Sequence, residues 1–143
     1  MFQFFDHTGD IGVDIDAADP GALFAHAAHA FTETVTDREA VAADEIVEVS
    51  LSADAIDLLL VDWLSELVYR FDADGWLARD VDVEVSAADA EEAAEWTLRA
   101  RLSGGRLDPE RQEVRVLVKA ITYHALEVVQ TGARWHARVI FDI

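Results

Sequence analysis

Residues 56–71 read IDLLLVDWLSELVYRF, and their apolar side chains recur at intervals of three and four residues. The apolar positions are Ile56, Leu59, Leu60, Trp63, Leu64, Leu67, Val68 and Phe71. This spacing places them on one broad face of an α-helix. Ser52 and Asp54 favour the start of that helix by capping and by the helix dipole, and Gly75 lies beyond its end. The stretch therefore predicts a long helix packed on the core.

Periodicity also assigns the rest of the chain. Asp19 followed by Pro20 is a typical helix start, and an apolar stripe then predicts a helix to about Val35. Alternation of apolar and polar residues predicts strands. The expected strands are 2–5, 11–17, 47–51, 81–85, 96–102, 114–118, about 121–130 and 134–142, with a loop at 87–93 and a turn-rich stretch at 103–112.

Two helices early and antiparallel hairpins late indicate the α+β class. The expected form is a two-layer sandwich, in which two main helices cover one face of a mostly antiparallel sheet. The chain has 143 residues, a length at which one domain can bury about 68–70% of the surface of its unfolded chain. Residues 1–143 are therefore predicted to form a single domain.

Acidic side chains dominate the composition. There are 29 Asp and Glu against 11 Lys and Arg, which gives a formal net charge of -18. Proteins that bind phosphate backbones cluster Lys and Arg, so direct nucleic-acid binding is not expected. A lysine-poor acidic surface is typical of proteins that work in concentrated salt, where a Debye length of about 3 Å at 1 M screens self-repulsion. We expect a halophilic source and a cytoplasmic location.

Several classes of function are disfavoured by what the sequence lacks. There is no cysteine, which excludes disulfides, thiolate metal ligands and cysteine nucleophiles. No segment approaches the roughly 20 consecutive apolar residues of a membrane span, and the N-terminus does not resemble a signal peptide. The serines lack a GxSxG elbow and no phosphate-binding glycine loop occurs, so nucleophilic catalysis has little support.

Hard oxygen donors occur near both ends of the chain. The side chain of Asp142 and the main-chain carboxylate of Ile143 are neighbours, and Asp10 adds a third carboxylate if the first strand lies beside the last. Such oxygens favour Ca²⁺ or Mg²⁺ over zinc or copper. Asp14 and Asp16, in contrast, are expected to be solvated surface charges, as most carboxylates are in so acidic a chain.

Lys119 is the only lysine in the sequence. In a chain whose composition avoids lysine, a retained ammonium suggests a role that the planar guanidinium of arginine cannot fill. The alternative is a charge on a strand edge. His7 and His124 are candidates for a supporting metal or acid–base role, although two histidines so far apart are more often hydrogen-bonded corner residues.

Five motifs together resemble the archease family, the small protein cofactors of the tRNA-splicing ligase that seals RNA ends using GTP. They are FFDHTGDIGVDI at 4–15, DWLSEL at 62–67, GGRLDPE at 104–110, VKAITYH at 118–124 and RVIFDI at 138–143. Each motif alone is weak, but five in this order and spacing are specific. The resemblance runs the length of the chain.

The resemblance implies a protein that is not an enzyme. It would bind the RNA ligase, promote guanylylation of the ligase's active-site histidine and support multiple turnover. The family's metal ligands carry over to Asp10, Asp142 and the terminal carboxylate of Ile143, with Ca²⁺ as the expected ion. The family's essential lysine carries over to Lys119. GTP and Mn²⁺ belong to the partner ligase.

Two departures from the family pattern stand in the sequence. HTGD at 7–10 replaces the usual HTAD, a change that spares Asp10. The family's GE-x-x-D turn appears as GGRLDPERQ at 104–112, with Arg106 in place of the glutamate and Arg111 or Gln112 at the following histidine. No role in contacting the ligase is carried over to this turn.

Two other readings stay open on the sequence. In a metal-dependent hydrolase, Asp10 and Asp142 would hold a divalent ion whose bound water attacks the substrate, with His7 or His124 as base. In a calcium-stabilised binding module, the ion would only tie the C-terminus to the first strand. Turnover by the isolated protein distinguishes the first, and activation that survives metal removal distinguishes the second.

Overall fold

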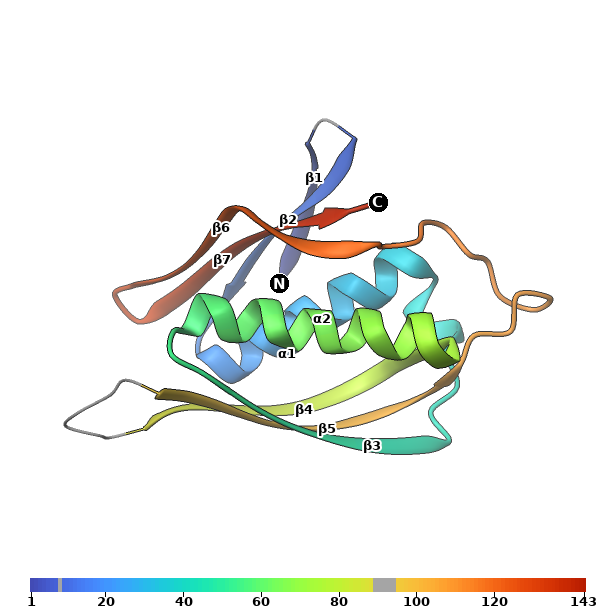
Figure 1. The fold of residues 1–143 in the computed structure, drawn as a ribbon, viewed down its shortest axis with the longest axis horizontal. Helices are drawn as coiled ribbons and strands as arrows, with labels where there is room; N and C mark the ends of the chain where they lie inside the picture. The colour runs from blue at the N-terminus through green and yellow to red at the C-terminus, as the bar shows by residue number, and fades with distance from the viewer. Residues whose placement is uncertain (8, 89–94) are drawn as a thin grey trace.

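The computed structural model describes residues 1–7, 9–88 and 95–143. Within these residues, seven strands, two long helices and a short 3-10 helix follow one another along the chain (Figure 1). They are β1 (Phe2–His7), β2 (Asp10–Ala17), α1 (Pro20–Val35), η1 (Arg38–Ala40), β3 (Glu45–Ala53), α2 (Ile56–Asp74), β4 (Trp76–Ala88), β5 (Glu95–Arg106), β6 (Ala120–Thr131) and β7 (Arg134–Asp142). The predicted α+β class is confirmed.

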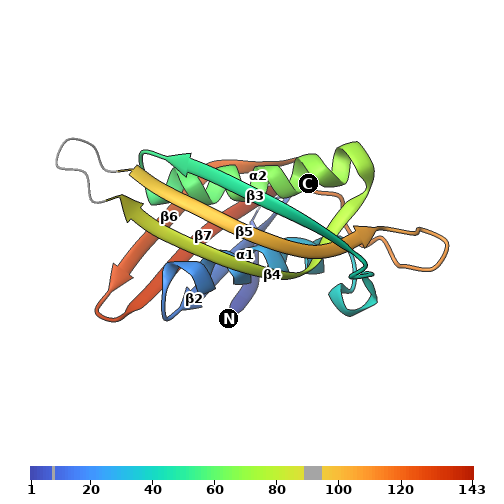
Figure 2. The same cartoon turned by 90° about the horizontal axis from the view of Figure 1, so that it is seen from below.

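The strands form two antiparallel sheets, and both helices lie between them (Figures 1 and 2). One sheet has the order β1-β2-β7-β6 and the other the order β3-β5-β4. Helix α1 packs on β4 and β2, whereas α2 packs on β6 and on all three strands of the smaller sheet. The molecule thus has three layers, where the sequence predicted two.

The apolar faces of the helices explain the third layer. The buried positions of α1 include Leu23, Phe24, Ala27, Ala28, Ala30, Phe31, Thr32, Thr34 and Val35. These positions surround much of the helix, and a helix that is apolar on more than one side must be covered on more than one side. A single sheet would leave part of α1 in water, so the strands divide into two sheets.

Trp63 joins the two helices at the centre of the core. Its side chain is fully buried, and its indole Nε1–H donates a hydrogen bond of 3.0 Å to the carbonyl oxygen of Phe24. Phe31 of α1 meets Phe141 of β7 edge to face, with ring centroids 6.3 Å apart. Burying the indole with its N–H satisfied avoids the cost of an unpaired polar group. The helical layer is therefore tied both internally and to the larger sheet.

The helix ends agree with the sequence at three of four positions. The Asp19 side chain accepts a hydrogen bond of 2.8 Å from the Ala22 amide, and α2 ends at Gly75, whose φ of 69° is the left-handed conformation that glycine favours. The expected side-chain cap on α2 is wrong. Its N-cap is Ala55, which makes no side-chain capping bond, so neither Ser52 nor Asp54 fills that role.

The segment between β5 and β6 differs from its prediction. Residues 114–118 were expected to form a strand, but they lie outside both sheets. Their alternation arises from packing instead, because Val118 is buried while Leu117 is exposed. The Arg115 amide donates a hydrogen bond of 2.7 Å to the carbonyl oxygen of Val35, which holds the segment against the end of α1. The expected loop at 87–93 lies mostly outside the described residues.

Candidate functional site

Strand register brings the sequence motifs from both ends of the chain to one end of the four-stranded sheet. Ile11 of β2 pairs with Phe141 of β7, so Asp10 and Asp142 occupy the adjoining ends of these two strands. Ala120 of β6 pairs with Asp142, which brings Lys119 to the same end. We call Asp10, Lys119, Asp142 and Ile143 the terminal cluster.

Lys119 is fixed to the end of β7 by its backbone. Its amide N–H donates a hydrogen bond of 2.7 Å to the carbonyl oxygen of Asp142. The Lys119 residue is exposed, whereas Asp142 and Ile143 are partly buried. Among the residues that the structure describes, the ammonium of Lys119 forms no ion pair or hydrogen bond. The lone lysine therefore presents a charge to solvent from a well-anchored backbone.

Asp10 begins β2 directly after a residue that turns the chain. Gly9 has a φ of 81°, a left-handed conformation that residues with a Cβ adopt at a cost. Gly12 serves a different purpose, because a Cβ at this position would overlap the ring of Phe5 on the neighbouring strand. The glycines that flank Asp10 thus shape the β1–β2 corner and its packing.

The two candidate histidines occupy different places. His7 is the register partner of Asp10 on β1, so its backbone lies at the end of the sheet that carries the terminal cluster. His124 is exposed and lies in the irregular part of β6, between the register pairs Thr122–Ile140 and Glu127–Arg138. A supporting role for either histidine stays a prediction.

The terminal cluster fits a hard divalent ion by donor type. The part of the chain that the structure describes contains no group of three His, Cys, Asp or Glu side chains placed to hold a metal. The predicted set has a different make-up, since only Asp10 and Asp142 contribute side chains and the third donor is the main-chain carboxylate of Ile143. Three such oxygens at neighbouring strand ends suit Ca²⁺. Metal binding remains a prediction.

The middle of the same strand pair is ion-paired. Asp14 of β2 faces Arg138 of β7 in the register, and the guanidinium donates two hydrogen bonds of 2.8 and 2.9 Å to its carboxylate. These bonds lower the pKa of Asp14. Asp16 likewise faces His136, whose Nδ1 lies 3.0 Å from its carboxylate. The expectation of a merely solvated charge is wrong for Asp14, whose side chain is 28% exposed.

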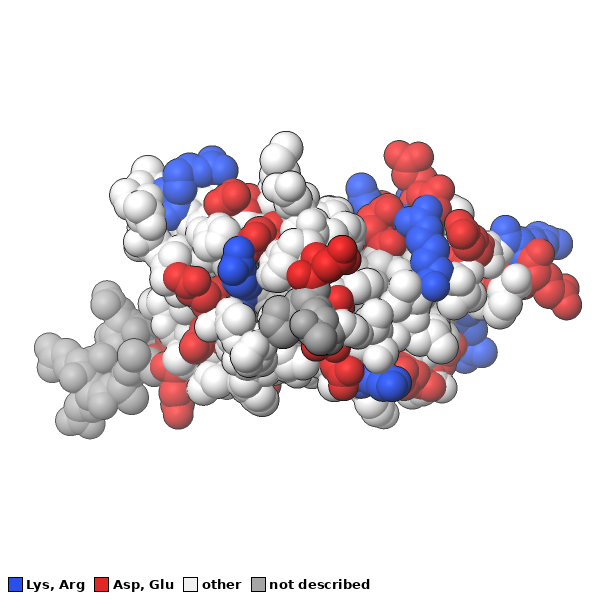
Figure 3. All heavy atoms as spheres, turned by 90° about the horizontal axis from the view of Figure 1, so that it is seen from above, with Lys and Arg blue, Asp and Glu red and all other residues white. Residues whose placement is uncertain are grey.

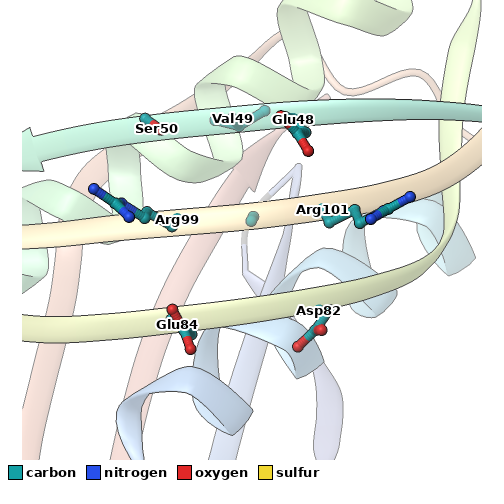
Figure 4. A pocket seen from close by; sticks show the side chains of 8 residues that line it. Glu48, Val49, Ser50, Asp82, Glu84, Arg99 and Arg101 are labelled. Carbon is teal, nitrogen blue, oxygen red and sulfur yellow. The ribbon is translucent and has the colours of Figure 1, made fainter.

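A hollow of about 460 Å³ lies on the outer face of the smaller sheet, well separated in the fold from the terminal cluster (Figures 1 and 4). Its charged lining residues are Glu48 on β3, Arg99 and Arg101 on β5, and Asp82 and Glu84 on β4. Each arginine has an acidic residue opposite it on at least one neighbouring strand. Opposite charges on facing strand positions are typical of a solvated sheet face, and we place no site here.

Charge is mixed over the surface that carries the larger sheet. Figure 3 shows basic and acidic side chains interspersed there, and several of both kinds gather toward the end where the segment between β5 and β6 lies. No helix of the described residues is long and apolar enough to cross a membrane. Among the described residues, this face shows no broad basic area in Figure 3.

Comparison with known proteins gives a consistent result. The family model described as the Archease protein family (MTH1598/TM1083) matches residues 2–143. The protein archease of Archaeoglobus fulgidus is 34% identical over 142 residues, which cover 99% of this chain and 98% of the relative. The protein archease of Methanopyrus kandleri is 33% identical, with 99% of each chain covered.

Solved structures share the fold. The solution structure of Methanobacterium thermoautotrophicum protein 1598 superposes with a TM-score of 0.79 at 31% identity and covers 99% of this chain and 98% of that one. The crystal structure of an archease from Thermotoga maritima, described as a possible chaperone, has a TM-score of 0.62 at 20% identity, covers 97% and 94% of the two chains, and supports the fold alone. By sequence over its whole length, the chain belongs to the archease family.

Proposed function

We propose that this protein activates the GTP-dependent tRNA-splicing RNA ligase, promoting ligase guanylylation and multiple turnover in tRNA splicing and RNA end ligation. The observation that carries the proposal is the terminal cluster. Strand register gathers Lys119, the only lysine in the sequence, with Asp10 and Asp142 at one end of the sheet. Family membership supports it. A relative described as a possible chaperone is consistent with an action on a partner protein.

In this proposal the protein is a non-catalytic cofactor, and the ligase performs the chemistry. Nucleotidyl transfer depends on positioned cations and on an in-line geometry at the phosphoryl group. Lys119 would offer a compact ammonium to anionic oxygens at the contact with the ligase. It would act either by aiding metal loading in the ligase or by aligning GTP there.

Asp10, Asp142 and the terminal carboxylate of Ile143 would hold a divalent ion, with Ca²⁺ as the expected one. When bound, the ion would offset the charge of these carboxylates and so draw the ends of β2 and β7 together. The hydrogen bond from the Lys119 amide to the Asp142 carbonyl couples the position of the lysine to this end of β7. Metal and lysine would thus act as one unit.

The charge of the chain limits its other contacts. A net charge of -18 repels the phosphate backbone, so the ligase, rather than this protein, would hold the RNA. The same surface suits a cytoplasm with concentrated salt, because short-range screening reduces its self-repulsion. We therefore propose a halophilic, cytoplasmic setting, and the assays below use high salt.

A ligation assay tests the proposal. It contains the cognate ligase at limiting concentration, GTP, Mn²⁺ and a broken tRNA, and compares the wild type with Lys119→Arg. We expect the wild type to restore multiple turnover and the arginine variant to fail, because the guanidinium differs in shape and hydration. Arg134→Ala, which removes an exposed cation at the opposite end of β7, should behave as the wild type. A wild type without effect on the ligase would refute the proposal.

One observation keeps a second candidate, a metal-dependent hydrolase using an Asp10/Asp142 divalent-ion site. His7 lies opposite Asp10 in the β1–β2 register, at the end of the sheet where such an enzyme would need a base. This candidate requires turnover by the protein alone. Hydrolysis of phosphate-ester probes by the isolated protein with Ca²⁺ or Mg²⁺, lost in Asp142→Asn, would favour it.

A further inference from the structure

Two exposed side chains with large apolar surfaces stand near Lys119 in the sequence. Leu117, two residues before it, is 57% exposed, and Tyr123, four residues after it, is 66% exposed. Single exposed apolar residues are common and need no explanation. Here two of them lie within four residues of the only lysine in the sequence, and the local backbone of each one accounts for its exposure.

Leu117 is held outward by its neighbours. Val118 is buried at 3% exposure, and the amide of Lys119 is bonded to the Asp142 carbonyl. On the other side, the Arg115 amide is bonded to the carbonyl oxygen of Val35. In an extended segment successive side chains point to opposite sides. With Val118 fixed toward the core, Leu117 must project into solvent.

Tyr123 is presented by a break in the strand pairing. Residues 123–126 of β6 lie opposite the single residue Val139, between the pairs Thr122–Ile140 and Glu127–Arg138. Within this bulge Ala125 has a φ of 55°, a left-handed conformation that residues with a Cβ seldom adopt. Such strain persists only where the surrounding structure enforces it, and it is frequent at functional sites.

The charge of Lys119 indicates what this surface meets. The chain has 29 acidic residues, yet within its described part none forms an ion pair with this ammonium. The positive charge of Lys119 is therefore available to an anionic group of a partner. A cation with an aliphatic and an aromatic side chain near it is complementary to an anionic group bordered by apolar depressions. Tyrosine is also among the residues that dominate binding energy at protein interfaces.

We propose that Leu117 and Tyr123 are the anchors by which the surface around Lys119 docks on a partner protein that places an anionic group opposite this lysine and apolar depressions opposite the two anchors. The identification of this partner with the RNA ligase rests on the proposed function. The two anchors supply affinity, and Lys119 supplies activation. This division of roles separates docking from activation experimentally.

The test measures ligase activation against protein concentration for Leu117→Ser and Tyr123→Ala. We expect each variant to raise the concentration for half-maximal activation at least tenfold, while the plateau stays that of the wild type. Lys119→Ala should do the reverse and lower the plateau, with the half-maximal concentration changed less than threefold. Calorimetry of binding to the ligase on the same samples should show the same tenfold losses for the two anchor variants.

Two controls make the result specific. Ile46→Ser removes a side chain of matched exposure, 56%, from the other sheet, and it should leave both readouts unchanged. Tyr123→Phe keeps the ring and should keep affinity. Urea midpoints of all variants should equal that of the wild type, because both anchors are exposed.

The outcomes are distinguishable from failure of the proposed function. Tenfold weaker calorimetric binding of the anchor variants supports docking, even if the wild type does not activate the ligase. Unchanged binding of both anchor variants overturns the docking proposal, while activation by the wild type leaves the proposed function standing. A wild type that does not bind the ligase refutes both. Equal losses from Ile46→Ser would also overturn the assignment, because they would show a non-specific effect.

Discussion

The middle and the end of the β2–β7 strand pair carry similar residues in different situations. In the middle, Asp14 faces Arg138 directly in the register and binds it through two hydrogen bonds. At the end, Asp142 faces Ala120, a residue without charge, on one side. Carboxylates on the same two strands thus differ in whether they are ion-paired, and this depends on the residue opposite each one in the register.

This difference follows from the energetics of paired charge. A bidentate arginine–carboxylate pair satisfies both partners and leaves little capacity for another ligand. The terminal cluster has two aspartates, a lysine and a main-chain carboxylate on neighbouring strands, and the described part of the chain shows no ion pair for the side chain of Asp142. The charges of Asp142 and Lys119 are therefore available for a metal or a partner, whereas those of Asp14 and Arg138 are already paired.

The largest expected effect separates the two regions by function. Asp142→Asn should lower ligase activation at least tenfold, because it removes one of the predicted metal ligands at the strand end. Asp14→Asn should leave activation per folded molecule unchanged, since the contacts of Asp14 are with Arg138 and His136, outside the terminal cluster. Ligation assays with limiting ligase, corrected for the folded fraction by circular dichroism, measure both variants.

Calcium binding provides an independent readout of the same comparison. Titration calorimetry should show at least tenfold weaker Ca²⁺ binding for Asp142→Asn and no change for Asp14→Asn. Equal Ca²⁺ affinity in both variants would remove the metal role from the terminal cluster. Activation that survives Asp142→Asn would reduce that cluster to a structural element.

The second effect separates the regions by stability. Asp14→Asn leaves Arg138 without its ionic partner and should lower the free energy of unfolding by about 1 kcal/mol, because hydrogen bonds to charged groups contribute more than neutral ones. The value is kept small because both side chains are partly exposed. Urea unfolding in high salt measures it. Asp142→Asn, measured without added metal, is the matched control and should cost less, since Asp142 faces the uncharged Ala120 across the β6–β7 pair.

The pH dependence of stability should reveal the same ion pair. The hydrogen bonds from Arg138 lower the pKa of Asp14 below its usual value of 3.8. A carboxyl group with a lowered folded-state pKa stabilises the fold above its unfolded-state pKa, and this contribution is lost as the pH falls through the folded-state pKa. The stability difference between the wild type and Asp14→Asn should therefore shrink as the pH falls below about 4.

The imidazole of His29 also contributes to the pH dependence of stability, and its contribution must be separated from that of Asp14. Burial lowers the pKa of His29 to about 4 from 6.5. The folded state thus favours the neutral imidazole, so stability falls as the pH drops from 6.5 towards 4. Both the wild type and Asp14→Asn contain His29, and their difference removes its effect. A difference that began to shrink above pH 6 would contradict the assignment to Asp14.

Periodicity in the sequence was sufficient for the elements that bury one continuous apolar face. Both helices and the strands that carry the terminal cluster begin and end close to their predicted residues. The condition set for Asp10, that its strand lies beside the last strand, is met because β2 and β7 are neighbours. Their metal-binding role remains a prediction, since donor type alone does not establish a bound ion.

The features that the sequence did not reveal depend on contacts between distant segments. The division into two sheets follows from how α1 is covered, and the bond between Asp14 and Arg138 depends on the β2–β7 register. Alternation at 114–118 has the same period whether a segment pairs in a sheet or packs alone, so it was misread as a strand. The bulge that exposes Tyr123 carried no glycine to signal it, because its left-handed residue is Ala125.

The smallest effect tests whether that bulge differs from the regular register around Asp14. Ala125→Gly removes the Cβ from a left-handed residue, which relieves about 1 kcal/mol or more, while glycine raises the entropy of the unfolded chain by a smaller amount. The free energy of unfolding should therefore rise by about 0.5 kcal/mol. Urea unfolding of this variant beside Ala137→Gly, a buried position of β7 with ordinary geometry, gives the contrast.

Ala137→Gly should be destabilising, because it removes a buried methyl group and loosens a strand interior. A loss of stability in both variants would mean that Ala125 is not strained. The bulge would then be energetically equivalent to the regular parts of the strand. A gain confined to Ala125→Gly would show that the fold accepts a local cost at the residues that present Tyr123. The strained residue Ala125 lies three residues after Thr122, where the irregularity begins. Ala120, on the same strand, pairs with Asp142. The strain would therefore lie on the strand that also carries the end of the sheet near Asp142.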